Sequence, residues 1–122
     1  MPSTEQIRRT VDGYVRSFRT EDKDLFLDLL AADVEQEDPV GGPPNRGKEA
    51  LGNFFDTVFG VCRSIDFDAR ELYISGDQCA LVFSIAQHRK DGSVVTLDGV
   101  DTFRIDDQGK VALVRGYAAE RS

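Results

Sequence analysis

Hydrophobic side chains recur at helical spacing over the first half of the chain. Residues 3–18 carry apolar side chains three and four positions apart, and Ser3 with Gln6 fits a capping box at the helix start. The same spacing predicts a second helix from about residue 22 to residue 31 and a third from residue 47 to about residue 59. The glycines and prolines between the second and third helices predict a loop.

After residue 60 the pattern changes to the alternation of β-strands. Apolar side chains occupy every second position in runs near residues 65–69, 81–85, 95–105 and 111–117. Turn-forming residues separate these runs, as hairpin connections require. Helices followed by a meander of strands predict an α+β domain in which an antiparallel sheet curls around the helices.

Length, hydrophobic content and charge restrict the class of protein. A chain of 122 residues with 40% hydrophobic content has the size of one ordinary domain, so we expect residues 1–122 to form one domain. No apolar run approaches the roughly 20 residues of a membrane span, and the N-terminus lacks the apolar core of a secretory signal. We therefore expect a soluble, cytoplasmic protein. The net charge of −7 argues against nucleic acid and anionic membranes as partners.

The cysteines and the histidine do not form a metal or redox motif. Cys62 and Cys79 are not spaced as a CxxC pair, and Cys79 alternates with Leu81 and Phe83 as a small core residue would. His88 stands beside two basic residues, and its simplest interpretation is a solvated residue at a strand end. The sequence therefore predicts no metal site.

Asp101 is the most informative polar residue of the strand region. In GVDTFRI it shares one face of the strand with Phe103 and Ile105. If that face belongs to the core, burial disfavours the carboxylate anion and the side chain becomes a neutral hydrogen-bond donor. The alternative is that Asp101 lies at a strand edge and faces water.

Asp38 and Tyr14 are each ambiguous by themselves. Asp38 follows a predicted strand in the stretch EDPVGG, where an aspartate before proline is common in turns. Tyr14 lies on the apolar face of the first predicted helix, where a tyrosine is usually a core residue. Together with Asp101 they supply one base and two donors, which is what proton abstraction beside a carbonyl requires.

Three stretches of this chain are similar to the Δ5-3-ketosteroid isomerases of the NTF2-like, SnoaL-like superfamily. They are the Tyr14-Val15 pair, the passage AADVEQEDPVGGPP, and the strand VDTFRI with the Gly-Lys-Val turn at residues 109–111. The resemblance spans nearly the whole chain and implies an NTF2-like cone, with three N-terminal helices packed in a curved antiparallel sheet. It also implies that Asp38 is the general base and that Tyr14 and a neutral Asp101 are the oxyanion-hole donors, the established pattern of that family.

The resemblance further implies the pocket, the substrate and the assembly. Phe83 and Phe103 match aromatic residues of the pocket. Phe55 stands where many members carry a tyrosine that hydrogen-bonds the catalytic tyrosine, and Ala118 stands where the family often has an aromatic wall, so we expect a shorter donor network and a wider pocket. The implied activity is a steroid Δ-isomerase that needs no cofactor, with a small hydrophobic ketone, a steroid, as substrate. A homodimer built through the sheets is also implied.

Two alternatives remain open at this point. The same scaffold hosts other enzymes, such as polyketide cyclases and epoxide hydrolases, and it also hosts non-catalytic small-molecule-binding modules. Epoxide opening would need a water-activating cluster of acids and bases, which the sequence does not suggest. A pure binding module would gain little from carboxyl groups placed in an apolar pocket.

Overall fold

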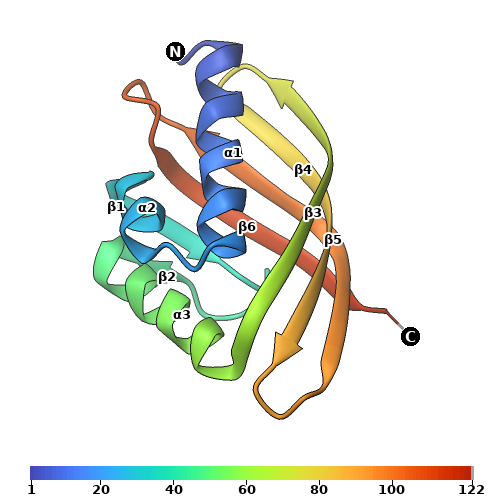
Figure 1. Cartoon of the computed structure of the whole chain (residues 1–122). Helices are drawn as coiled ribbons and strands as arrows, with labels where there is room; N and C mark the ends of the chain where they lie inside the picture. Colours follow the sequence, from blue (N-terminus) through green and yellow to red (C-terminus); the bar gives the residue numbers. More distant parts are fainter. Residues whose placement is uncertain (122) are drawn as a thin grey trace.

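In the computed structural model, which describes residues 1–121, the helices lie against one side of a strongly curved sheet (Figure 1). The helices are α1 (Thr4–Arg19), α2 (Lys23–Asp28) and α3 (Gly47–Val61). The strands are β1 (Leu30–Glu37), β2 (Asn45–Arg46), β3 (Cys62–Ser75), β4 (Gln78–Arg89), β5 (Val94–Ile105) and β6 (Val111–Glu120). They form one sheet in the order β2-β1-β6-β5-β4-β3. The predicted α+β architecture is confirmed, and no helix within residues 1–121 is long and apolar enough to cross a membrane.

The sheet is mixed, which corrects the prediction of an antiparallel sheet. The meander β3 to β6 is antiparallel throughout, as predicted, but β1 runs parallel to β6. Glu35 lies opposite Leu113 and Glu37 lies opposite Arg115 in this parallel pair. The chain passes through α3 and four strands between β1 and β6, so no hairpin fixes their relative direction. Local sequence signals could not reveal this pairing.

The second helix is shorter than predicted because a strand takes over its last turn. Asp22 caps α2, and its Oδ1 accepts a hydrogen bond of 3.0 Å from the Leu25 backbone N–H. The helix ends at Asp28 rather than near residue 31, because Leu30 already pairs with Val111 of β6. Tertiary pairing has overridden the helical spacing of these apolar residues.

The other helices begin near their predicted starts. Ser3 Oγ accepts from the Gln6 backbone N–H at 3.1 Å, which is the predicted N-cap contact. The Gln6 side chain does not complete the capping box and instead donates to Thr10 Oγ1 at 3.2 Å. α3 starts at Gly47 as predicted and continues for two residues past Phe59. The predicted loop before α3 contains the two-residue strand β2, which pairs with β1.

An aromatic cluster fills the space between the helices and the sheet. Phe18 packs against Phe26 and Phe55 with ring centroids 5.3 Å away in each case, and Phe55 lies 4.8 Å from Phe59. The Arg19 Nε–H donates to the Phe67 carbonyl at 2.8 Å and ties the end of α1 to β3. These contacts hold α1 across the concave face of the sheet (Figure 1).

Strands β5 and β6 approach each other closely at Gly99. Gly99 lies opposite Ala118, and a Cβ built on Gly99 would be 2.2 Å from the Tyr117 carbonyl oxygen and 2.9 Å from the Ala118 Cα. Both neighbours are backbone atoms, so they cannot move without spreading the strands. A side chain larger than hydrogen therefore does not fit at this position without a shift of the backbone.

We expect Gly99→Ala to lower the free energy of unfolding by about 1–3 kcal/mol, because the added methyl group overpacks the strand pair. The matched control is Gly60→Ala, since no atom lies within 4 Å of a Cβ at that position of α3 and alanine is the better helix former. Urea unfolding of both variants measures the effect. Equal stability of Gly99→Ala and the unaltered protein would contradict the close approach of the strands.

Candidate functional site

Three neighbouring strands bring two carboxyl groups to one place. Asp38 directly follows β1, whose last residue Glu37 pairs with Arg115 of β6. Asp101 of β5 lies opposite Gly116, the next residue of β6. The Val40 backbone N–H donates to the Gly116 carbonyl at 3.0 Å, which ties the segment after Asp38 to β6. The parallel pairing of β1 with β6 is therefore what places Asp38 beside Asp101.

Gly116 leaves the space that the two carboxyl groups occupy. A Cβ at Gly116 would lie 2.7 Å from Asp38 Oδ1 and 3.2 Å from Asp101 Oδ1. Both oxygens thus lie within 3.2 Å of one point on the inner face of β6. A side chain on Gly116 would displace the Asp38 carboxyl, so the glycine is part of the arrangement.

Tyr14 reaches the same pocket from α1. Its ring meets Phe103 nearly edge-on, with centroids 5.0 Å away and an interplanar angle of 79°, and it also packs against Phe18 at 5.3 Å. The residue is only 3% exposed, so its ring has a fixed orientation. Within residues 1–121 no hydrogen bond engages the Tyr14 hydroxyl or the carboxyls of Asp38 and Asp101. These polar groups are available to a ligand.

The pKa values of the three groups are shifted to different extents because their surroundings differ. Burial raises the pKa of Asp101 to about 8, and the nearby Asp38 charge adds to this shift, so Asp101 is neutral at pH 7. Asp38 lies at the exposed rim, where partial desolvation of its carboxyl raises its pKa less far. Burial, followed by the two aspartates, raises the pKa of Tyr14 well above its ordinary value. Asp38 is therefore the group that ionises first.

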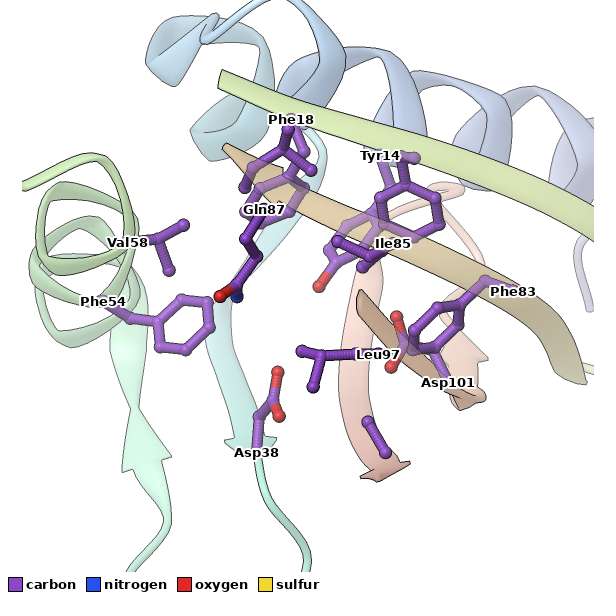
Figure 2. A pocket seen from close by; sticks show the side chains of 13 residues that line it. Tyr14, Phe18, Asp38, Phe54, Val58, Phe83, Ile85, Gln87, Leu97 and Asp101 are labelled. Atoms are coloured by element: carbon purple, nitrogen blue, oxygen red, sulfur yellow. The ribbon is translucent and has the colours of Figure 1, made fainter. Parts of the chain in front are cut away.

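The groups open into an apolar pocket of about 210 Å³ (Figure 2). The lining residues come from α1, α3, the end of β1 and strands β3 to β6, and they are Tyr14, Phe18, Asp38, Phe54, Val58, Ile65, Phe67, Phe83, Ile85, Gln87, Leu97, Asp101 and Ala118. Most of them are aliphatic or aromatic, so the pocket suits a largely hydrophobic molecule.

Five of the seven residues predicted for the site line this pocket, namely Tyr14, Asp38, Phe83, Asp101 and Ala118. Phe55 and Phe103 do not line it. Phe55 is 2% exposed and packs in the aromatic cluster, because it shares a helix face with Leu51 and Phe59. Phe103 lies behind Tyr14 and supports the tyrosine ring.

Sequence reasoning missed several lining residues, notably Phe54, Gln87 and Leu97. Phe54 directly precedes Phe55 in α3, and it faces the pocket together with Val58, four positions later. Gln87 continues the inward alternation of Phe83 and Ile85 along β4. That continuation was the one available signal, although a polar residue at an inward position near a strand end is easily taken for a solvated one.

The arrangement combines one ionisable base with two neutral donors in an apolar cleft. An ionised Asp38 can accept a proton, while the Tyr14 hydroxyl and the protonated Asp101 can each donate a hydrogen bond to an oxygen that gains negative charge. Among residues 1–121 no three His, Cys, Asp or Glu side chains are grouped so as to hold a metal ion. The geometry is suited to proton transfer next to a carbonyl group.

Comparison with known proteins assigns this chain to a family. The family model described as "SnoaL-like domain" matches residues 11–114. A Δ5-3-ketosteroid isomerase from Mycobacterium sp. is similar in structure, with a TM-score of 0.84 and 27% identity over 95% of this chain and 98% of that one. RV0760c from Mycobacterium tuberculosis, solved in complex with estradiol-17beta-hemisuccinate, has a TM-score of 0.84 and 28% identity over 92% of each chain.

The fold also occurs in enzymes of other activity. The epoxide hydrolase/cyclase-like enzyme SalBIII, which acts in pyran ring formation in the polyether salinomycin, has a TM-score of 0.88 at 19% identity over 98% of this chain and 95% of that one. At this identity the similarity concerns the fold alone: an α+β structure with a curved, open, six-stranded mixed sheet. With the family model matched over residues 11–114, this chain belongs to the SnoaL-like domain family and has the NTF2-like fold.

Proposed function

We propose that this protein is a steroid Δ-isomerase, which converts 3-oxo-Δ5-steroids to 3-oxo-Δ4-steroids. One observation carries the proposal: Asp38 and Asp101 share the space beside Gly116, yet burial keeps Asp101 neutral while Asp38 ionises first. An enzyme that forms an enolate needs a base and a neutral donor side by side, and an apolar pocket ordinarily excludes two charged carboxyls.

The reaction is a proton transfer that Asp38 begins and ends. The Asp38 carboxylate takes the proton from C4, between the C3 carbonyl and the C5–C6 double bond. The electron pair of the broken C–H bond forms a C3–C4 double bond, and the carbonyl π electrons move to the oxygen, giving a dienolate. Protonated Asp38 then gives the proton to C6, the C3 carbonyl re-forms, and the double bond lies between C4 and C5. Atoms and charges balance without a cofactor.

Tyr14 and Asp101 stabilise the dienolate oxygen in this scheme. Both are neutral donors at pH 7, because their raised pKa values keep the phenol and the carboxylic acid protonated. Neither group loses a protein hydrogen bond when it turns to the substrate. The rings that pack against Tyr14 belong to Phe18, Phe26 and Phe103, so the proposed donor set consists of Tyr14 and Asp101.

Several features support a steroid as the substrate. The pocket is apolar apart from a few polar groups, and two structural neighbours at 27% and 28% identity are a ketosteroid isomerase and a protein in complex with an estradiol derivative. Ala118 lines the pocket with a small side chain, which supports a pocket that accepts a bulky ring system. A homodimer, which the family resemblance implies, stays a prediction.

We expect the purified protein to convert 5-androstene-3,17-dione to its conjugated isomer, and Asp38→Asn to lower kcat by about 10² to 10⁴-fold. Asparagine has nearly the same size but cannot accept the C4 proton. The rise in ultraviolet absorbance of the enone follows the reaction. Asp33→Asn, an exposed substitution on β1, is the control. Activity that survives Asp38→Asn would make Asp38 a turn residue, and an inactive unaltered protein would favour a binding module or another reaction.

We expect Tyr14→Phe and Asp101→Ala each to lower kcat by about 10² to 10³-fold, with a smaller change in KM. The donors matter most when the oxygen carries charge, so their loss affects the transition state more than the bound ketone. Asp101→Asn should retain more activity than Asp101→Ala, because an amide still donates. A change confined to KM in all three variants would place these residues outside the oxyanion hole.

The raised pKa of Asp101 predicts that stability falls as pH rises from about 4 to about 8. In this window Asp101 is ionised when the chain is unfolded and protonated when it is folded, so unfolding releases a proton. This one group lowers the free energy of unfolding by up to about 1.4 kcal/mol per pH unit. Asp101→Asn removes the effect.

Urea unfolding at about pH 5 and about pH 8 compares Asp101→Asn with the unaltered protein. The variant should gain stability relative to the unaltered protein as pH rises, and Asp33→Asn provides the matched surface control. Parallel pH dependences of Asp101→Asn and the unaltered protein would show that Asp101 ionises freely in the folded state.

A further inference from the structure

We propose that Gln87 determines specificity at the far end of the pocket by donating a hydrogen bond to a second oxygen of an elongated polycyclic ketone. This inference rests on the proposed function and deepens it, because it names the substrate's second polar group. Apart from Tyr14, Asp38 and Asp101, Gln87 is the one polar residue that lines the pocket described within residues 1–121.

Gln87 lies at the opposite end of the pocket from the two donors. On β4 it faces inward in alternation with Phe83 and Ile85, and it comes six residues after Leu81, which lies opposite Asp101. Figure 2 shows its carboxamide on the side where α3 contributes Phe54 and Val58, with Asp101 on the other side. Between the two ends the pocket is lined by apolar side chains.

Arg89 fixes the orientation of the Gln87 amide. The Arg89 Nη2 and Nε groups donate to Gln87 Oε1 at 2.9 Å and 3.3 Å. A guanidinium group has only donors, so the atom that it contacts must be the amide oxygen rather than the nitrogen. The Gln87 NH2 group is thereby directed away from Arg89, and it has no hydrogen-bond partner within residues 1–121.

The unpartnered NH2 group calls for an acceptor on the ligand. The neighbouring positions are apolar, since Gln87 pairs with Ile65 on β3 and with Val95 on β5. A ligand that fills this end of the pocket displaces water from the amide, and a ligand without an acceptor would leave the donors unsatisfied. The positively charged Arg89 guanidinium donates to the amide oxygen, which polarises the amide and strengthens its N–H donors. A ketone oxygen meets this requirement.

The distance along β4 between Gln87 and the position opposite Asp101 requires a ligand of a certain length. Six residues of strand correspond to roughly 20 Å in a straight strand, and the curvature of the sheet and the reach of the side chains shorten the path between the polar atoms. A molecule that contacts both Asp101 and Gln87 is therefore elongated. A fused four-ring ketone with an oxygen at each end fits this description, whereas a small ketone can contact only one end.

Equilibrium binding of two non-reacting ligands tests the inference. Estrone and 17-deoxyestrone share the phenol that would face Tyr14 and Asp101, and they differ only in the distal ketone. We expect the unaltered protein to bind estrone about 10-fold more tightly than its deoxy analogue, as measured by calorimetry or by competition. In Gln87→Leu and Gln87→Glu the ratio should fall to about 1. The glutamate variant keeps an oxygen for Arg89 but has no N–H donor.

His88→Gln is the matched control, because His88 is the adjacent residue and contacts Asp66 at 2.8 Å outside the pocket. This variant should keep the 10-fold ratio. A ratio of about 1 in the unaltered protein, or an unchanged ratio in both Gln87 variants, would overturn the inference. Failure of the unaltered protein to bind either ligand would overturn it as well, since the ligand class would be wrong.

Isomerisation of 5-androstene-3,17-dione by the same variants separates this inference from the proposed function. Discrimination between the two phenols without any isomerisation would support the role of Gln87 and count against the isomerase. Isomerisation without discrimination between the two phenols would support the isomerase and count against the role of Gln87. If both hold, the loss in Gln87→Leu should appear in KM more than in kcat, because the distal contact is the same in the ground and transition states.

Discussion

The site depends on one constraint: two carboxyl groups share the space that a missing side chain leaves at Gly116, inside a pocket too apolar to hold both as anions. The strand order β1-β6-β5 imposes this contact, since β6 lies between the strands that carry Asp38 and Asp101. Burial then makes the pKa values of the two carboxyl groups differ, because Asp38 is exposed at the rim and Asp101 is buried. In the proposed reaction, Asp38 would then act as the base and Asp101 as the donor.

The helices divide the interior into a packed part and an open part. On α3, Phe55 and Phe59 face the core, while Phe54 and Val58 are rotated toward the pocket. The aromatic cluster thus fixes the Tyr14 ring without filling the space in front of its hydroxyl. The end of the pocket away from Asp101 is lined by Gln87 of β4 and by Phe54 and Val58 of α3, so the pocket is polar at both ends and apolar between them.

Much of this could be read from the sequence, because the signals were local. The helical spacing of apolar residues predicted α1 and α3, and the alternation around Asp101 correctly indicated that this residue is buried. Two features had no local signal. The parallel pairing of β1 with β6 joins segments that are far apart in the chain, and the choice between Phe54 and Phe55 as the lining residue depends on how α3 is rotated against the sheet. The α2 boundary was wrong for a related reason, since Leu30 gains more from pairing with β6 than from another helical turn.

The charge state of Asp101 is the central claim, and carboxyl-carbon NMR measures it most directly. Selective labelling of aspartate, with Asp101→Asn to assign the signal, gives the titration of this group in the free protein. We predict that Asp101 titrates near pH 8, after Asp38, and that it stays protonated when a phenolic steroid is bound. An Asp101 signal that titrates near the ordinary aspartate value of about 4 in both states would contradict the account, because two anions would then share the site.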